Sequence, residues 1–238
     1  MENRILVVDD DPSISKLIEF HLKLAGFEVQ CVHDGDSVLN MVNDYRPSLI
    51  VLDVMLPKMD GIQVCRKLRG QNNMTPIIML SALHEIPDKI VGLDNGADDY
   101  MTKPFSPQEL ISRIHSVVRR VRPFLPADEY ESIQIGSIEI FPEQREVTVD
   151  GKSTELTPKE FELLYFLCKH KGKVMSRRQL LHGVWDYNFL EDTRIVDVHI
   201  SHLRDKIEKN SRDPEYIITI RNVGYKLKDP GIGQASMA

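Results

Sequence analysis

The first half of the chain alternates short apolar runs with stretches in which apolar residues recur at helical spacing, and this alternation restricts the fold more than any other feature. The apolar runs, of strand length, cover residues 5–8, 49–52 and 76–80, with a weaker run at 27–32. Strands that are apolar on both faces and separated by helices predict a parallel sheet with helices on both sides. We expect five strand–helix units over residues 1–122, that is, a doubly wound (βα)5 sheet of the α/β class.

The second half begins and ends with a different strand pattern. Residues 133–140 and 146–149 alternate apolar and polar side chains with a period of two, and Asp150-Gly151 predicts a hairpin turn. Residues 216–220 and 224–228 predict two more strands joined by a short turn. These segments indicate antiparallel strands on either side of a helical middle.

Three helices are predicted between those strands. Residues 157–160 and 176–179 are capping boxes, and the helix that the second one begins reaches Trp185. A loop at 186–192 precedes the third helix, at 193–209, whose inward stripe has helical spacing. This stripe consists of Val196, Ile200, Leu203 and Ile207. Together with the strands, the three helices predict an α+β winged helix-turn-helix domain.

The two patterns divide the chain into two domains, which suits its 238 residues. We expect one domain over residues 1–121 and a second over 132–229. Residues 122–131 hold prolines and acids without periodicity and are predicted to be a linker. Residues 230–238 are expected to be a disordered tail.

Composition and cysteine usage favour a protein of the cytoplasm. The three cysteines are far apart in the sequence and have no CxxC spacing, which is typical of buried thiols in a reducing compartment. The start of the chain has no signal-peptide pattern, and no apolar run is long enough to span a bilayer. We therefore expect a cytoplasmic protein without a membrane partner.

The charge is distributed unevenly along the chain. The net charge is −6, which by itself argues against nucleic-acid binding. Residues 169–228, however, carry 13 basic and 8 acidic side chains, a net charge of +5. This local excess indicates an anionic partner for the second domain.

Charged and polar residues follow the strands of the first domain. They are Asp9, Asp10 and Asp11 after the first strand, Asp53 at the end of the third, Ser81 after the fourth and Lys103 after the fifth. In an open parallel sheet, residues at the carboxyl ends of the strands share one crevice. Clustered carboxylates favour Mg²⁺, and a lysine and a serine beside them suit phosphoryl transfer to a carboxylate. On its own, the run Asp9 to Asp11 is equally typical of a helix N-cap before Pro12.

These residues belong to segments that resemble a known family. Residues 5–12 (ILVVDDDP), 49–61 (LIVLDVMLPKMDG), 76–82 (PIIMLSA) and 96–105 (GADDYMTKPF) resemble the receiver domain of bacterial two-component response regulators. Residues 194–199 (RIVDVH), 203–206 (LRDK) and 221–225 (RNVGY) resemble the winged-helix output domain of the OmpR/PhoB subfamily. The resemblance runs from about residue 3 to residue 228.

The resemblance implies a role for each residue of the first domain. Asp53 is implied to accept a phosphoryl group from a sensor histidine kinase, with Mg²⁺ held by Asp9, Asp10, Asp53 and the carbonyl of Met55. Lys103, Ser81 and Tyr100 are implied to sense the phosphoryl group, with Tyr100 rotating inward. Phosphorylation is implied to promote a homodimer through a charged face that contains Lys89, Asp98, Asp99, Glu109 and Arg113.

The third helix of the second domain is the expected reader of double-stranded promoter DNA. The face opposite its apolar stripe holds Arg194, Val198 and Ser201, with His202 to one side. We expect Val198 to contact a thymine methyl group, although a surface valine without a function is as common. Phosphate contacts are expected from Arg177, Arg204 and Lys206, and the resemblance places Arg221 at the wing.

The sequence departs from the subfamily at two places. Ser201 and His202 stand where relatives often carry arginines, so the base preference of those relatives does not transfer to this chain. Asn222 replaces a common wing glycine.

A phosphatase is disfavoured as an alternative function, because Met55 occupies the position of the second acid that such enzymes usually carry. No enzyme activity is therefore expected beyond the chain's own phosphoryl transfer and dephosphorylation. A regulator that binds DNA without accepting phosphate is the alternative, and RNA polymerase is a further expected partner.

Overall fold

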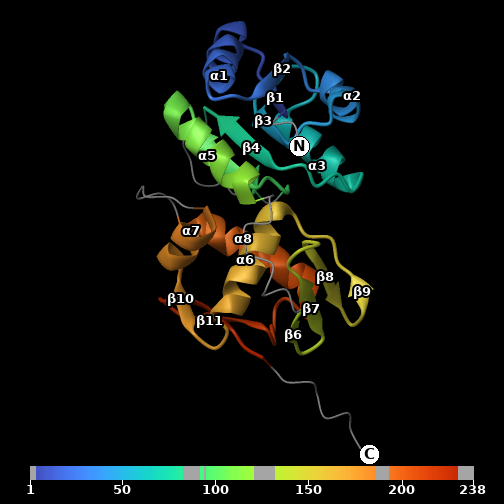
Figure 1. The fold of residues 1–238 in the computed structure, drawn as a ribbon, viewed down its shortest axis with the longest axis vertical. Helices are drawn as coiled ribbons and strands as arrows, with labels where there is room; N and C mark the ends of the chain where they lie inside the picture. The colour runs from blue at the N-terminus through green and yellow to red at the C-terminus, as the bar shows by residue number, and fades with distance from the viewer. Residues whose placement is uncertain (1–3, 83–91, 94, 121–131, 186–192, 230–238) are drawn as a thin grey trace, which may run out of the picture. The chain divides into compact units, whose positions relative to one another are not determined.

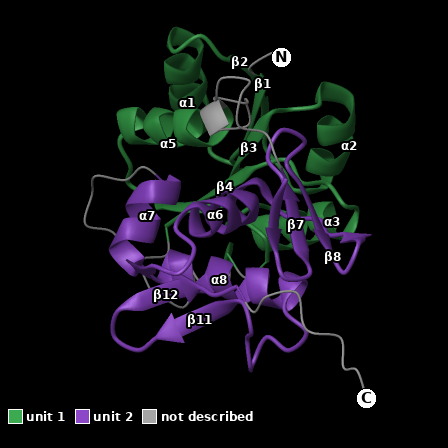
Figure 2. Cartoon of the chain, turned by 60° about the horizontal axis from the view of Figure 1, so that its bottom comes forward, with its two compact units in different colours: residues 1–122 green, residues 123–238 purple. Residues whose placement is uncertain are grey.

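The computed structural model describes residues 4–82, 92–93, 95–120, 132–185 and 193–229. The chain forms two compact units, Met1–Arg122 and Pro123–Ala238 (Figure 2). The predicted linker at 122–131, the predicted loop at 186–192 and the predicted tail at 230–238 lie outside the described residues. The proposed domain boundaries therefore stay predictions.

The first unit is built on a five-stranded parallel sheet, as predicted. Its strands are β1 (Arg4–Val8), β2 (Glu28–Val32), β3 (Leu49–Asp53), β4 (Ile77–Ser81) and β5 (Asp99–Thr102). Their order across the sheet is β2-β1-β3-β4-β5, and each adjacent pair is parallel. The order reverses at β1, so a crevice opens beyond the carboxyl ends of β1 and β3.

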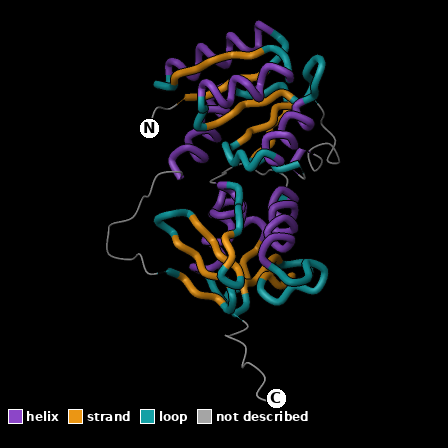
Figure 3. The backbone as a smooth tube through the Cα atoms, turned by 90° about the vertical axis from the view of Figure 1, so that its right-hand side faces the viewer, coloured by secondary structure: helices purple, strands orange, loops and turns teal. Residues whose placement is uncertain are grey.

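Helices cover both faces of this sheet. They are α1 (Pro12–Leu24), α2 (Asp36–Tyr45), α3 (Gly61–Gly70) and α5 (Pro107–Arg120). In Figure 1, α1 and α5 lie on one side of the strands and α2 and α3 on the other, and Figure 3 shows the strands between helices. The predicted fourth helix falls mostly on residues outside the described ranges. The double cover explains why β1, β3 and β4 are apolar along almost their whole length.

The second unit combines two small antiparallel sheets with three helices. The first sheet contains β6 (Ile133–Ile135), β7 (Ile138–Phe141), β8 (Glu146–Val149) and β9 (Lys152–Ser153) in that order. The helices are α6 (Pro158–Lys169), α7 (Arg177–Trp185) and α8 (Arg194–Ile207). The second sheet has the order β10-β12-β11, with β10 (Val174–Ser176), β11 (Ile217–Ile220) and β12 (Gly224–Leu227). This is the predicted winged helix-turn-helix.

Two details of the second unit differ from the prediction. The single strand predicted over 133–140 is two strands, because Gly136, with φ 55°, reverses the chain between β6 and β7. Strand β10 was not predicted, since three residues are too few to show an alternating pattern. This strand pairs with β12 and so joins the segment before α7 to the wing hairpin of β11 and β12.

Local sequence signals placed the starts of α6 and α7 and the wing turn correctly. Thr157 and Glu160 form a capping box at α6, and Ser176 and Gln179 exchange the same pair of hydrogen bonds before α7. At the wing, Asn222 has φ 61°, a conformation that asparagine tolerates better than most residues. Over the part of the chain that the structure describes, no helix has both the length and the apolar character that crossing a bilayer requires.

Candidate functional site

Three carboxylates meet at the carboxyl ends of β1 and β3. One side-chain oxygen from each of Asp9, Asp10 and Asp53 lies within 4.8 Å of the others. Asp9 and Asp53 are buried, with relative exposures of 0% and 3%, whereas Asp10 is exposed. The predicted convergence of these carboxylates is therefore confirmed, with two of them buried and one exposed.

Lys103 supplies the positive charge in this crevice. Its Nζ lies 2.7 Å from Asp9 Oδ2 and 2.7 Å from Asp53 Oδ2. Burial raises the pKa of Asp53, while the hydrogen bond and charge of Lys103 act in the opposite direction. Burial also opposes the charge of Lys103, but its hydrogen bonds to Asp53 and Asp9 and the negative charges of both residues together outweigh that effect and raise the pKa of Lys103. The lysine is therefore held as a cation between two carboxylates.

The backbone around Asp53 fixes its carboxylate. The Met55 N–H donates to Asp53 Oδ1 over 3.2 Å, which leaves Oδ2 to Lys103. Gly61, at the start of α3, approaches β3 so closely that a Cβ there would lie 2.1 Å from the Asp53 carbonyl oxygen. Met55, predicted to supply a carbonyl to a metal, has an exposed side chain beside the crevice. The loop after β3 thus both orients Asp53 and lies next to the carboxylate cluster.

The donor set suits a hard divalent cation. Asp9, Asp10 and Asp53 offer carboxylate oxygens, and no histidine or thiol joins them among the described residues. Oxygen ligands with open positions for water and a phosphoryl group are the environment that Mg²⁺ prefers. The acidic pocket therefore fits Mg²⁺, as receiver domains require. Asp11 instead caps α1, where its carboxylate accepts from the Ser13 N–H.

Two of the predicted phosphoryl-sensing residues, Ser81 and Tyr100, lie on the neighbouring strands β4 and β5. Ser81 ends β4 and is fully buried, and Tyr100 on β5 is 7% exposed. A Cβ at Gly92 would lie 3.4 Å from the Tyr100 ring, so glycine leaves space for the aromatic side chain. The tyrosine occupies a buried position in this structure, and its predicted inward rotation stays a prediction.

The charged residues predicted for a dimer face are mostly engaged inside the first unit. Asp98 is fully buried and accepts from Arg69 Nη2 and the Ile77 N–H, at 3.0 and 2.9 Å, which contradicts its prediction as part of an exposed face. Arg113, only 3% exposed, contacts Asp99 at 3.2 Å and Glu109 at 2.6 Å. The pattern of charges did not reveal these internal partners. Lys89 lies outside the described residues.

The polar face of α8 matches the prediction at most positions and differs at one. Arg194 and Ser201 are exposed and His202 is partly exposed, as expected for a surface that meets DNA. Val198 is 7% exposed, so the prediction that it faces outward to a thymine methyl group is wrong. Helix α8 packs against both α6 and α7, and its buried arc is therefore wider than the single stripe used to orient it.

The basic residues expected to contact phosphates make contacts within the second unit. Arg204 donates to the Ile217 carbonyl, with its Nε at 3.0 Å, and to Thr219. Lys206 pairs with Glu160 at 2.6 Å, and Arg177 pairs with Asp197 at 2.7 Å. Arg221 is exposed in the wing turn, as predicted. The spacing of charges along a helix identified these residues but not the partners that hold them.

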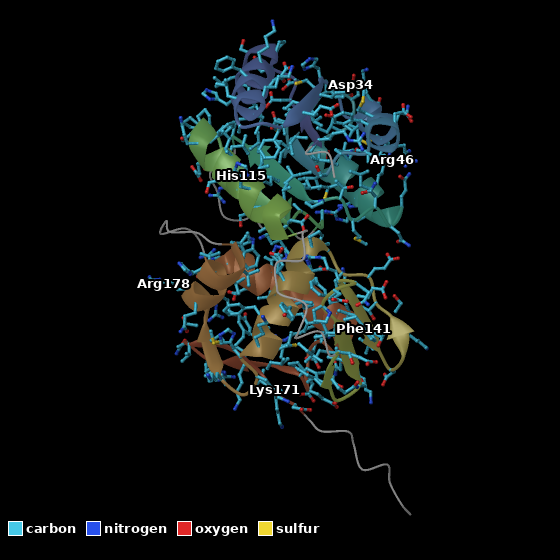
Figure 4. All side chains as sticks on the ribbon, in the orientation of Figure 1. Asp34, Arg46, His115, Phe141, Lys171 and Arg178 are labelled. Carbon is cyan, nitrogen blue, oxygen red and sulfur yellow. The ribbon has the colours of Figure 1, made fainter. Side chains whose placement is uncertain are left out.

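Two residues near this surface were given no role from the sequence. Tyr225 and Asp197 hydrogen-bond to each other over 2.7 Å between β12 and α8. An aromatic residue in a strand usually indicates core packing, so no sequence signal separated Tyr225 from other buried rings. Arg178, labelled on α7 in Figure 4, is a further exposed cation that the sequence did not single out.

Comparisons with known proteins agree with both units. Residues 5–115 match the family model of the response regulator receiver domain, and residues 151–227 match that of the transcriptional regulatory protein, C terminal. The chain is 50% identical over 240 residues to the alkaline phosphatase synthesis transcriptional regulatory protein PhoP of Bacillus subtilis, a match covering 98% of this chain and 100% of that protein.

Solved structures give the same result. The response regulator DrrB of Thermotoga maritima, an OmpR/PhoB homologue, is similar over 96% of this chain and 100% of its own, with 33% identity and a TM-score of 0.52. A RitR mutant is similar over 95% of this chain and 99% of its own, with 28% identity and a TM-score of 0.74. The chain therefore belongs to the OmpR/PhoB subfamily of two-component response regulators, which regulate transcription by binding DNA.

Proposed function

We propose that Asp53 accepts a phosphoryl group from the phosphohistidine of a partner sensor kinase, in a Mg²⁺-dependent reaction that controls DNA binding by the second domain. The observation that supports this most strongly is the Asp53 carboxylate itself. It is buried at the carboxyl end of β3, 2.7 Å from the Lys103 ammonium and within one cluster with Asp9 and Asp10. Asp9 shares the burial, the Lys103 contact and the cluster, and it is the match to the receiver-domain family that favours Asp53 as the acceptor.

We assign a task to each group in the carboxylate cluster. A carboxylate oxygen of Asp53 attacks phosphorus, the P–N bond to the kinase histidine breaks, and the electron pair leaves with the imidazole nitrogen. The Met55 N–H holds Asp53 Oδ1 in place, and the Lys103 ammonium offsets negative charge on the transferred group. Asp9, Asp10, Asp53 and the Met55 carbonyl would hold Mg²⁺, which would neutralise negative charge on the phosphoryl oxygens.

Ser81 and Tyr100 are the residues we assign to sensing the new phosphoryl group. The Ser81 hydroxyl ends the strand beside β3, from which it can donate to a phosphoryl oxygen on Asp53. Tyr100 lies on β5, next to β4, so a shift at Ser81 reaches its ring through adjacent strands. These positions support a path from Asp53 to the face of β5 and α5.

We further propose that phosphorylation promotes a homodimer through this face. Glu109 is the partly exposed member of the ion-pair group that also holds Arg113 and Asp99. Dimerisation brings two winged-helix domains to adjacent DNA half-sites, where each can also contact RNA polymerase. Since promoter DNA and the kinase domain that phosphorylates such regulators are in the cytoplasm, we place the protein there.

On the second domain, we assign direct DNA contacts to the exposed polar residues. Arg194, Ser201 and His202 lie on α8 where base edges or phosphates are within reach, and Arg221 lies in the wing turn. Arg177, Arg204 and Lys206 are held by partners in the domain, so we assign them to positioning the surface as well as to phosphate contacts.

The test of the phosphoacceptor is intact mass after incubation of the full chain with acetyl phosphate. With Mg²⁺ present, we expect a single phosphoryl adduct on the wild type and on Asp11→Asn, the control, because Asp11 caps α1. We expect no adduct on Asp53→Asn, and none on the wild type in excess EDTA. An adduct on Asp53→Asn equal to that on the wild type would contradict the assignment.

A further inference from the structure

Four side chains from three elements of the second unit converge on one aromatic ring. We call this group, Tyr225, Asp197, Arg177 and Arg204, the tyrosine cluster. The Tyr225 hydroxyl donates to Asp197 Oδ1 over 2.7 Å, and Arg177 Nε donates to the same oxygen over 2.7 Å. The guanidinium carbons of Arg177 and Arg204 lie 5.1 and 5.6 Å from the centre of the Tyr225 ring. The ring thus receives two cations while its hydroxyl binds one carboxylate.

The cluster joins α7, α8 and the wing hairpin, the elements to which the proposed function assigns DNA contacts. Arg177 is the first residue of α7, Asp197 lies in the first turn of α8, and Tyr225 lies on wing strand β12. Arg204, near the end of α8, also donates to the Ile217 carbonyl and Thr219 Oγ1 on wing strand β11. Both strands of the wing hairpin are therefore tied to α8, one through Tyr225 and the other through Arg204.

The environment of Tyr225 keeps its hydroxyl protonated. Tyr225 is 5% exposed, and burial together with the hydrogen bond to Asp197 raises the pKa of Tyr225 to about 12. The hydroxyl accordingly stays a donor at physiological pH, and Asp197 accepts two charge-compatible hydrogen bonds. The side chain of Arg177 is 28% exposed, and among the described residues its Nη1 has no hydrogen-bond partner. One nitrogen of an otherwise fixed guanidinium is thus available at the surface.

We propose that Tyr225 and Asp197 are positioning residues for DNA binding, which hold the Arg177 guanidinium toward a DNA phosphate and fix the wing against α8. The proposal rests on the DNA-binding function of the second domain and adds residues that do not themselves contact DNA. A helix and a wing read adjacent grooves only when the angle between them is fixed, because a small rotation at α8 displaces the wing tip. Arg177 also begins α7, where the helix dipole adds to its attraction for a phosphate.

A purely structural role for Tyr225 can be distinguished from a positioning role, because the chain contains a second buried tyrosine that serves as a control. Tyr216 is buried to the same degree as Tyr225, at 6% exposed, and its hydroxyl also makes hydrogen bonds, with the Ser137 N–H and Oγ at 3.0 and 2.9 Å. The Tyr216 hydroxyl thus connects the residue before β11 to the turn between β6 and β7, and its hydrogen bonds involve neither α7 nor α8. If Tyr225 only stabilised the fold, Tyr225→Phe and Tyr216→Phe would behave alike.

The experiment measures the affinity for DNA of the full-length wild type and of each full-length variant. The probe is a duplex selected by the wild-type protein from a random-sequence library, with an unselected duplex of equal length as the non-specific reference. We expect Tyr225→Phe to weaken binding to the selected duplex about tenfold, the size expected for losing a hydrogen bond to a charged group. We expect Tyr216→Phe to remain within about twofold of the wild type, at matched fractions of folded protein.

The contact to phosphate is tested by salt dependence and by a double-mutant cycle. Arg177→Gln is expected to reduce the slope of log affinity against log salt by about one, as expected for one lost phosphate contact. Asp197→Ala is expected to reduce the slope similarly in the wild type, and to cause no further reduction of the slope when Arg177 is already glutamine. Equal losses for Tyr225→Phe and Tyr216→Phe, or fully additive effects of Asp197→Ala and Arg177→Gln, would overturn the proposal.

A failure of DNA binding itself is distinguishable from a failure of this proposal. A wild-type chain that enriches no duplex from the library would contradict the DNA-binding function of the domain and, with it, any positioning role. A wild-type chain that enriches a duplex, with all four variants binding it within about twofold, would contradict the positioning role alone.

Discussion

At the scale of single residues, the account depends on one ammonium group shared by two buried carboxylates. Lys103 lies 2.7 Å from oxygens of both Asp9 and Asp53, and neither carboxylate is open to bulk water. Two such carboxylates repel each other unless a cation lies between or beside them. Lys103 therefore stabilises the crevice and competes in part with Mg²⁺, which neutralises the same charges.

This competition gives a prediction for Lys103→Met. In EDTA, we expect the variant to lose about 3 kcal/mol of unfolding free energy, because two buried carboxylates lose their counter-charge. Mg²⁺ should recover more stability in Lys103→Met than in the wild type, since binding to the folded state alone stabilises it. Urea unfolding in EDTA and in saturating Mg²⁺ measures both quantities.

Lys58 provides the control for this prediction. Its side chain is 61% exposed and pairs with Asp34, labelled in Figure 4, at 3.5 Å, so Lys58→Met should change stability by less than about 0.5 kcal/mol. If Mg²⁺ raised the unfolding free energy by the same amount in Lys103→Met and in the wild type, Lys103 would not be offsetting the negative charge of the two carboxylates.

At the scale of elements, one arginine on α3 holds together the loops at the amino-terminal edge of β4 and β5. Arg69 Nε donates to the Gly96 carbonyl at 3.0 Å, and its Nη1 donates to the carbonyls of Asn73 and Thr75. Its Nη2 pairs with the buried Asp98 at 3.0 Å. Helix α3 is thereby fixed to the segments that precede both strands of the sensing face.

We predict that Arg69→Met destabilises the protein by about 3 kcal/mol, because it removes the Arg69 cation from the buried Asp98 carboxylate and takes the donors away from three backbone carbonyls. The midpoint of urea denaturation measures the change. Arg66→Met, one turn earlier on the same helix, is the control, since Arg66 is exposed and donates only to the Asn95 side chain. A loss no larger in Arg69→Met than in Arg66→Met would refute the anchoring role.

The elements that sequence reasoning predicted well are those whose signals are local. The strands of the first unit are continuous apolar runs, and Asp53 and Lys103 follow their strands directly, so their convergence followed from parallel pairing alone. The turn at Gly136 was missed although the apolar positions change phase there, from Ile133 and Ile135 to Ile138 and Ile140. That phase change was the available signal for two strands.

The residues predicted incorrectly depend on contacts between elements that are distant in sequence. Spacing on a helix gives the direction of Val198 but not which neighbouring helix covers it. A charge beside a strand end, such as Asp98, looks like a surface residue until Arg69 from another helix is found next to it. The tyrosine cluster was not predictable for the same reason, because its four side chains come from three elements.

At the scale of the whole molecule, the chain joins two units that each have their own core. One buried cluster runs from Ile5 to Val117 within the first unit, and another runs from Ile135 to Leu227 within the second. The carboxylate crevice belongs to the first unit and the basic surface to the second. We therefore expect chemistry at Asp53 to change the way the second unit engages DNA.

The measurement that tests this account most directly is the affinity of the full chain for its selected duplex with and without acetyl phosphate and Mg²⁺. We predict that phosphorylation raises the affinity of the wild type about tenfold or more, as expected when a dimer binds two half-sites, and leaves Asp53→Asn unchanged. Light scattering on the same samples should show a dimer only for the phosphorylated wild type. An affinity that is identical in all four samples would contradict the account and indicate a regulator that binds DNA independently of phosphorylation.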